Sequence, residues 1–388
     1  MSVRKRTWIT RKGDAKEAWL VDYVDQHGER HIQTFGRKKD ADEYHATVKV
    51  DVRQGVHTPH SKSITVAEAA EDWIKYVELE GRERSTITAY RQQVDLHIIP
   101  RLGQKKLAKL TTPGINDFRD SLLEINQKTG KPNMSRAMAM KVLTGLKMLL
   151  KDAHRRGNVA QNVALGVSIK PDKRAKSKLN VGVDIPTPDE IKRIVHAATG
   201  KSRPFLLTAI FTGLRASELR GLRWSDVDLK KGELDVRQRA DRYYQIGKLK
   251  SESGERTVPI GPLVLNALRE WKLACPKSNL GLVFPNGRGK VEDHANLLKR
   301  VLWPVQIAAG VVDAKGTAKY TGLHSLRHFY ASWCMNRLAD GGLELPLKTV
   351  QARLGHASIM MTADTYGHLF PRTDDGKELA EAERTLLA

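Results

Sequence analysis

A charged stretch with few apolar side chains interrupts the chain at residues 170–178, which read KPDKRAKSK. Such a stretch has little to bury, so we place a boundary between separately folded parts there. A second polar stretch without periodicity, HTPHSKS at residues 57–63, divides the part before it. The 388 residues are too many for one ordinary core and are predicted to form three domains, over residues 1–56, 63–169 and 181–388.

All three domains carry an excess of basic residues, and the middle one is the most densely basic. The chain has 66 Lys and Arg against 44 Asp and Glu, a formal net charge of +22. This balance favours a polyanion as partner, with nucleic acid the leading candidate, because a membrane-surface protein would gather its charge on one amphipathic helix. The longest apolar run, residues 205–211, is too short to cross a bilayer, and the N-terminus lacks a signal-peptide apolar region. Cys275 and Cys334 are the only cysteines, which argues against a disulfide framework and fits a reducing cytoplasm.

The first domain is predicted to be a small three-stranded sheet followed by a helix. Strand-like runs at residues 7–9, 18–24 and 31–35 precede a helical stretch over residues 37–53. This is too little to be robust alone, so we expect an appended module. Its basic clusters could grip phosphates, but a solvated basic surface explains them equally well. The clusters are Arg4, Lys5 and Arg6, then Arg11 and Lys12, and then Arg37, Lys38 and Lys39.

The second domain is predicted to be all-α. Its first helix begins at a capping box made by Thr65 and Glu68, and helical stretches follow over residues 85–98, 112–125 and 135–156. Basic side chains lie among these helices, and for each one a solvated position competes with a contact to DNA. The candidates for a DNA contact are Arg91, Arg136 and Lys141.

The third domain is predicted to be mainly helical, with one small antiparallel sheet between residues 230 and 260. It opens with a second capping box, Thr187 with Glu190. The predicted helices then cover residues 205–212, 262–273, 294–309, 324–338 and 346–354, and the predicted strands residues 234–236, 243–246 and 257–260. Residues 375–388 are expected to form a tail helix, with a frayed terminus as the alternative.

Several residues of the third domain can handle a phosphodiester. Arg215 and Arg327 each offer a planar charged fork that matches phosphate oxygens, and together they would neutralise a phosphorane as charge develops. Tyr366 is a candidate nucleophile that needs a base, and His324, one helical turn from Arg327, could serve. A lysine or histidine must then protonate the departing sugar oxygen.

Taken alone, each candidate has an ordinary explanation. Arg215 and Glu218 can form a surface ion pair, Lys250 can be a solvated residue of a hairpin tip, and His356 follows a glycine that would end a helix. His328 is predicted to be a packed or capping histidine. A metal site built from the histidines would lack acidic partners, so we predict neither metal nor cofactor. The combination favours catalysis, because each residue supplies a different part of one reaction.

Four motifs, in this order, resemble those of the tyrosine recombinase (integrase) family. They are TGLRASEL at residues 212–219, KSESGERTVP at 250–259, HSLRH at 324–328, and LGH at 354–356 with YGHLF at 366–370. The resemblance covers roughly residues 187–370, and none of the motifs would suffice alone.

The resemblance implies that Tyr366 attacks the scissile phosphate to give a 3′-phosphotyrosine and a free 5′-hydroxyl. Arg215, Arg327 and His356 would hold the non-bridging oxygens, with Glu218 as an orienting carboxylate.

The family also implies two groups that move protons. Lys250 would be the acid for the 5′-oxygen, with Lys248 on the same hairpin as the alternative, and His324 would be the proton-transfer partner of Tyr366.

The resemblance further implies that the partner is double-stranded DNA, at core and arm attachment sites. Residues 1–56 look like the arm-type DNA-binding module of phage and genomic-island integrases, and residues 63–169 like the helical core-binding domain, which forms a clamp with the catalytic domain. The family implies a homotetramer on DNA whose C-terminal tail docks on a neighbouring subunit. Action in the bacterial cytoplasm, nucleoid-associated when bound, is expected. An excisionase or a DNA-bending host protein is a further candidate partner.

The predicted function is a site-specific DNA recombinase that integrates and excises a phage or mobile genetic element. A type IB topoisomerase-like nicking-closing enzyme is the alternative enzyme, since it uses similar residues. A non-catalytic DNA-binding protein is the other alternative, and the intact residue set argues against it.

Overall fold

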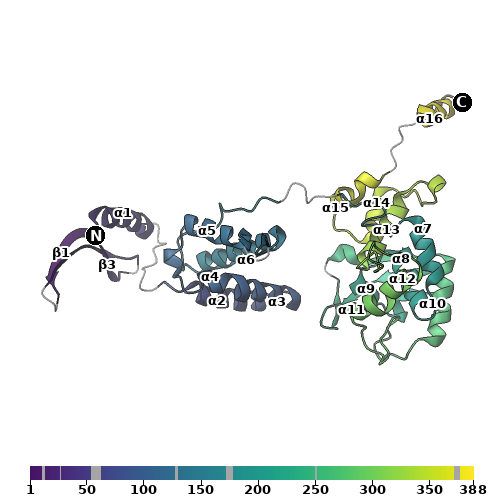
Figure 1. The fold of residues 1–388 in the computed structure, drawn as a ribbon, viewed down its shortest axis with the longest axis horizontal. Helices are drawn as coiled ribbons and strands as arrows, with labels where there is room; N and C mark the ends of the chain where they lie inside the picture. Colours follow the sequence, from purple (N-terminus) through teal and green to yellow (C-terminus); the bar gives the residue numbers. More distant parts are fainter. Residues whose placement is uncertain are drawn as a thin grey trace. The chain divides into compact units, whose positions relative to one another are not determined.

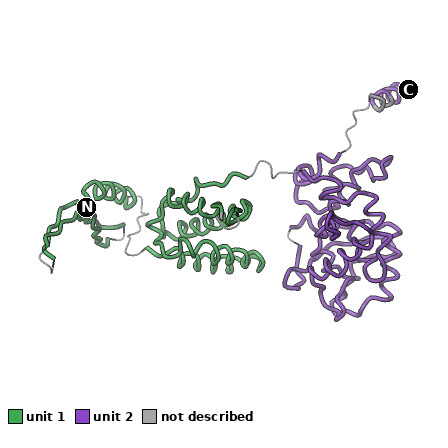
Figure 2. Tube along the Cα trace, in the orientation of Figure 1, with its two compact units in different colours: residues 1–176 green, residues 177–388 purple. Residues whose placement is uncertain are grey.

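The computed structural model describes residues 1–10, 14–26, 28–53, 63–126, 130–171, 178–249, 251–370 and 376–388. The chain divides into two compact units, residues 1–176 and residues 177–388 (Figures 1 and 2). Separate groups of buried apolar side chains stabilise the helices of each unit. No helix among the described residues is long and apolar enough to cross a membrane.

The first unit begins with the predicted sheet and helix. Strands β1 (Ser2–Ile9), β2 (Ala15–Val24) and β3 (Arg30–Phe35) pair antiparallel in the order β1-β2-β3. Helix α1 (Lys38–Arg53) covers this sheet, and its inward residues pack with those of β2 to make a small core. The core consists of Val21, Tyr23, Ala41 and Val48, which confirms that this part has little apolar area to bury.

The rest of the first unit is helical, as predicted, apart from a two-residue strand pair at 125–126 and 131–132. The helices are α2 (Val66–Leu79), α3 (Arg84–Gln93), α4 (Ile99–Leu102), α5 (Thr112–Leu123) and α6 (Arg136–Arg155). The capping box of Thr65 and Glu68 is confirmed. A π-helical turn at Val94–Ile98 joins α3 to α4, so helical backbone runs beyond the predicted end at residue 98. The cap of α5 is Thr111, one residue before the predicted start of this helix, because Thr111 is extended and its hydroxyl accepts from the Gly114 N–H.

The second unit is mainly helical with two small antiparallel sheets. Its helices are α7 (Pro188–Ala197), α8 (Ser202–Thr212), α9 (Ala216–Gly221), α10 (Pro262–Ala274), α11 (His294–Leu297), α12 (Trp303–Ala308), α13 (His324–Met335), α14 (Leu347–Leu354), α15 (Ile359–Tyr366) and α16 (Gly376–Leu387). One sheet has the order β10 (Arg256–Pro259), β7 (Glu233–Val236), β6 (Val227–Asp228), and β8 (Gln238–Ala240) pairs with β9 (Ile246–Lys248) in the other. The predicted fold class is confirmed, with two sheets in place of one.

Three details of this unit differ from the prediction. The predicted strand over residues 243–246 is mostly a turn, because the Asp241 carboxylate accepts from the Tyr243 and Gln245 N–H groups and bends the chain back. The predicted helix at 294–309 is continuous in its backbone but includes a π-helical turn at Leu298–Leu302 that was not predicted. The helix predicted to reach residue 338 ends at Met335, where Asn336 is extended.

Helix α8 is the central element of this unit. It is apolar nearly all round, with Phe205, Leu206, Leu207 and Ile210 buried, and it contacts α7, α10 and α13. A helix buried on every side has a fixed position, so the residues that follow its C-terminus start from a rigid support.

Candidate active site

A glycine turn at the end of α8 sets the position of Arg215. Gly213 has φ +62°, and a Cβ there would lie 2.3 Å from Cδ1 of Tyr330, so only glycine fits. The chain then becomes extended at Arg215, which is the N-cap residue of α9. The Arg215 backbone N–H donates to Oε2 of Glu218 at 2.9 Å, and Nη1 donates to Oε1 at 2.7 Å. The predicted pair of Arg215 and Glu218 is present, but Glu218 is buried rather than on the surface.

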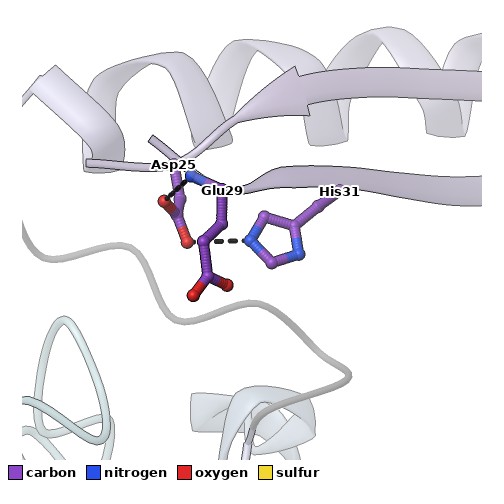
Figure 3. Close-up of side chains that lie close together, drawn as sticks. All are labelled: Asp25, Glu29 and His31. Carbon is purple, nitrogen blue, oxygen red and sulfur yellow. Dashed lines mark hydrogen bonds and ion pairs between the residues drawn. The ribbon is translucent and has the colours of Figure 1, made fainter. Parts of the chain in front are cut away.

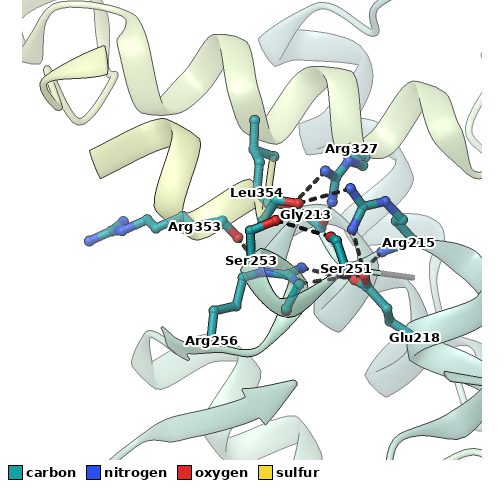
Figure 4. A network of polar contacts seen from close by, with 11 residues as sticks. Gly213, Arg215, Glu218, Ser251, Ser253, Arg256, Arg327, Arg353 and Leu354 are labelled. Carbon is teal, nitrogen blue, oxygen red and sulfur yellow. Dashed lines mark hydrogen bonds and ion pairs between the residues drawn. The ribbon is translucent and has the colours of Figure 1, made fainter. Parts of the chain in front are cut away.

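A third arginine, Arg256 of β10, holds Glu218 from the other side (Figure 4). Its Nη2 donates to Oε2 of Glu218 at 2.8 Å, and the two side chains are only 6% and 2% exposed. Burial raises the pKa of the Glu218 carboxyl, but Arg256 and Arg215 together lower it by more. Its pKa therefore lies below the ordinary value, and the group is ionised. The sequence motifs contain Arg256, but its role was not predicted.

Arg256 also fastens the loop that carries His356. Its Nε donates to the carbonyl of Arg353 at 2.7 Å and its Nη1 to that of Gly254 at 2.8 Å. A Cβ on Gly355 would lie 2.8 Å from Nη1 of Arg256, so the close passage of this arginine requires glycine there. One side chain therefore joins the turn before β10, the start of α9 and the end of α14.

Backbone carbonyls at two helix ends orient Arg327 (Figure 4). Its Nη1 donates to the carbonyl of Gly213 and its Nη2 to that of Leu354, both at 2.6 Å. Arg215 donates from Nη2 to the Gly355 carbonyl at 3.1 Å, so the two arginines lie over the same loop. Burial and the neighbouring Arg215 lower the pKa of Arg327 to about 9, which leaves it charged at neutral pH. The C-terminal ends of α8 and α14 offer the partial negative charge that a buried cation needs.

The ring of His356 lies parallel to that of Tyr366. The two rings are inclined by 2° with centroids 6.3 Å apart, and Nδ1 of His356 is 2.9 Å from the Thr362 hydroxyl. Burial, with Arg327 and Arg215 next, lowers the pKa of His356 to about 4, so the ring is neutral at physiological pH. Helix α15, which was not predicted, begins at the cap residue Ser358 and ends at Tyr366.

Tyr366 is 1% exposed, and its hydroxyl is hydrogen bonded to His328. The distance from the hydroxyl to Nδ1 of His328 is 2.8 Å. Burial raises the pKa of Tyr366 to about 12, although Arg327 and Arg215 act in the opposite direction. The sequence predicts His324 as the proton-transfer partner of Tyr366 and His328 as a packed or capping residue, whereas the hydrogen-bond partner of the hydroxyl in the structure is His328.

His324 lies beside His328 on helix α13. Their ring centroids are 4.5 Å apart, with the rings nearly perpendicular at 84°. Although His324 is exposed to solvent, desolvation by the surrounding protein lowers its pKa, and Arg327 and Arg215 lower it further. The spacing of four residues places both rings on one helix face, and this was the available signal that could have identified His328 as a second candidate.

Lys250, the predicted acid, lies outside the described residues. Lys248, the alternative, is the exposed last residue of β9. After position 250, the hydroxyls of Ser251 and Ser253 are 3.0 Å apart.

Most of the basic residues proposed as DNA contacts are exposed and some are in ion pairs. Arg4 pairs with Asp22, Lys5 with Glu17, Arg37 with Asp40, Lys39 with Glu43, and Arg91 with Glu71 and Glu78. Exposed pairs of this kind stabilise little. Arg6, Lys38, Arg136 and Lys141 are also exposed, while Arg11 and Lys12 lie outside the described residues.

One group of side chains with metal-ligating atoms occurs among the described residues, and it lies in the first unit (Figure 3). Asp25, Glu29 and His31 bring their ligand atoms within 4.8 Å of one another. Asp25 accepts from the Glu29 N–H at 2.9 Å, and its other oxygen is 2.8 Å from Nε2 of His31. These bonds close the turn between β2 and β3, which is a sufficient reason for the cluster.

Residues 186–372 match the phage integrase family, and residues 65–123 match its N-terminal SAM-like domain. The chain belongs to the phage integrase family of tyrosine recombinases. It is 28% identical over 364 residues to the tyrosine recombinase XerC-like protein of Caldanaerobacter subterraneus subsp. tengcongensis, covering 86% of this chain and 87% of that protein.

Solved structures of integrases share the fold. The Tn1549 transposon integrase in complex with a circular intermediate DNA has a TM-score of 0.62 at 19% identity, covering 83% of this chain and 100% of that one. A lambda integrase tetramer bound to a Holliday junction has a TM-score of 0.55 at 19% identity, covering 91% and 95%. Tyrosine recombinases are site-specific DNA strand-transfer enzymes, and this chain is one; the nicking-closing and non-catalytic alternatives are not favoured.

Proposed function

We propose that this tyrosine recombinase cleaves and rejoins DNA through a 3′-phosphotyrosine on Tyr366, and so integrates and excises a phage or mobile genetic element. The observation that carries the proposal is that Arg215, Arg327, His356 and Tyr366, which lie on or next to four different helices, meet around one loop at Leu354–His356. Two fixed cations and a phenol beside them are what an in-line displacement at a phosphodiester needs.

Each side chain then has a role. Arg215, Arg327 and His356 hold the non-bridging oxygens, and the buried carboxylate of Glu218 fixes Arg215. Lys250 protonates the leaving 5′-oxygen. Because Tyr366 and Arg327 are each 1% exposed, binding of DNA must uncover them before the phosphate can enter.

The partner in this proposal is double-stranded DNA. The formal charge of +22 and the exposed basic residues of the first unit support it, since neutralising phosphates releases counterions. Residues 1–56 bind arm sites, and residues 63–169 and the catalytic domain at 181–388 both bind the core site. Four chains assemble on two duplexes, in the way that a lambda integrase tetramer is bound to a Holliday junction. The reaction takes place at the bacterial nucleoid, with an excisionase or a DNA-bending host protein as a further partner.

The test uses a nicked duplex that carries the junction sequence flanking the element. The full chain should form a covalent protein–DNA adduct, and Tyr366→Phe should abolish the adduct while DNA binding persists. Tyr244→Phe, which removes a different hydroxyl of the same unit, should leave adduct formation intact. An adduct that survives in Tyr366→Phe would show that another residue is the nucleophile.

A further inference from the structure

The hydroxyl of Tyr366 lies against His328, a histidine to which the family resemblance assigns no role. Nδ1 of His328 is 2.8 Å from the hydroxyl, and the ring centroids are 5.6 Å apart at 62°. His328 follows Arg327 on helix α13. Two backbone carbonyls hold the Arg327 side chain, so this part of the helix, which carries the imidazole, has a fixed position. A nucleophile and a base within hydrogen-bond distance, on a rigid support, form the arrangement that activates a hydroxyl.

Burial and the neighbouring charges keep the ring of His328 neutral. Burial has the largest effect on its pKa, followed by His324 and Arg327. Together they lower the pKa to about 4, while Asp184 acts in the opposite direction. Burial raises the pKa of Tyr366 to about 12, so the phenol remains protonated at neutral pH. In the tautomer of the neutral ring that carries its proton on Nε2, Nδ1 accepts from the Tyr366 hydroxyl, and the bond then points in the direction of proton transfer.

We propose that His328 is a catalytic residue of strand cleavage, which takes the Tyr366 proton on Nδ1 as the phenol oxygen attacks phosphorus. In this step the Tyr366 oxygen–phosphorus bond forms and the phosphorus–O5′ bond breaks. The phenol proton moves to His328, and the leaving 5′-oxygen takes a proton from a separate acid. The inference rests on the proposed function of Tyr366 and assigns the base for that same site.

The surroundings also offer a way for the proton to leave. A neutral imidazole that accepts on Nδ1 carries its own proton on Nε2, and it can release that proton once the step is complete. The exposed ring of His324 lies edge-on to His328 with 4.5 Å between centroids, so solvent and a second imidazole are adjacent. His324 thus belongs to the same proton path, one ring further from the nucleophile than predicted.

The hydrogen bond has a rival explanation as a restraint that only stores Tyr366 in a closed site. The two explanations predict opposite effects of His328→Gln in the full chain. Loss of a base should slow adduct formation on the nicked duplex by about 10²- to 10⁴-fold. Release of a restraint should leave the rate unchanged or raise it, and either result would overturn the proposal.

Two further readouts separate a base from a merely structural residue. With sulfur in place of the bridging 5′-oxygen the leaving group needs no acid, so Lys250→Ala should regain its rate while His328→Gln stays slow. Over about pH 6 to 9 the rate of His328→Gln should rise about tenfold per unit, because only hydroxide then removes the phenol proton, and the wild-type rate should rise less. An equal loss at every pH, or rescue of His328→Gln by sulfur, would contradict a base.

Controls keep this result distinct from a failure of folding or of the proposed function. His328→Phe keeps an aromatic ring against His324 and Tyr366, and it should show the same loss as Gln with unchanged DNA binding and melting temperature. His196→Gln alters an exposed histidine whose ring contacts only the Lys192 carbonyl, and it should cleave at the wild-type rate. If Tyr366→Phe is inactive while both His328 variants cleave normally, the nucleophile stands and the base assignment falls.

Discussion

The ion pair between Arg256 and Glu218 should be the most costly single contact to break in the catalytic unit. Arg256→Met removes two hydrogen bonds to Glu218, one to the Arg353 carbonyl and one to the Gly254 carbonyl. Breaking a buried pair from one side typically costs about 3–5 kcal/mol, because the remaining charge is left uncompensated. Glu218 keeps Arg215 at 2.7 Å, so we expect about 2–3 kcal/mol.

Calorimetry of the full chain is the suitable assay, since two units need not unfold together. A loss of about 2–3 kcal/mol in a unit of about 200 residues lowers the melting temperature of its transition by about 4–12 °C. Arg237→Met is the matched control: Arg237 pairs with Asp235 at 2.6 Å, but its side chain is 64% exposed, and such pairs contribute about 1 kcal/mol or less. If Arg256→Met melted no lower than Arg237→Met, the stabilising role assigned to Arg256 would be wrong.

Three other changes have defined outcomes. Gly213→Ala should lower the free energy of unfolding by more than about 2 kcal/mol and reduce adduct formation, because the new Cβ meets Tyr330 and shifts the carbonyl that holds Arg327. Gly200→Ala is the control: Gly200 has φ +50° and open space around it, so this change should cost only about 1 kcal/mol in a melting experiment. Thr362→Val should cost about 1–3 kcal/mol by removing the hydroxyl partner of the buried His356, while Thr365→Val, whose hydroxyl bonds a carbonyl near the surface, should cost less. The melting temperature should fall as the pH drops from about 6.5 to 4, because the unfolded chain binds protons at ordinary histidine pKa values while His328 and His356 stay neutral until their pKa of about 4. His356→Gln should flatten that slope, and an unchanged slope would count against its lowered pKa.

The elements that the sequence predicted well are those whose cause is local. The capping boxes at Thr65 and Thr187 place a hydroxyl and a carboxylate three residues apart, and both helices begin there. The strand predicted over residues 243–246 failed because one carboxylate, Asp241, captures two backbone N–H groups and competes with the ladder. Apolar alternation alone did not reveal that competition.

The site divides in the same way between what motifs show and what only the fold shows. Arg215, Arg327, His356 and Tyr366 were proposed from their order and residue types, and the fold brings them to one loop. The part played by Arg256 depends on contacts with residues 38 and 97 positions away, so spacing could not reveal it. His324 and His328 lie four residues apart on the same face of α13, so their positions in the sequence do not distinguish them. The direction from which α15 approaches α13 decides which ring meets the phenol.

The way Arg327 is held indicates how the site can be both buried and ready for phosphate. A guanidinium has five N–H donors, and two of them are bonded to the Gly213 and Leu354 carbonyls, so about three can still meet oxygens. The carbonyls fix the orientation of the fork before DNA arrives, and no reorganisation of the cation is then needed when charge develops on the phosphate. DNA binding must instead move the side chains that keep Arg327 buried. These include Tyr366 itself, which packs with Tyr330 and Leu354. His328 is hydrogen bonded to the same phenol, so any movement of α15 that admits phosphate also determines whether the bond between Tyr366 and His328 is kept. Uncovering the site and activating Tyr366 therefore become one event.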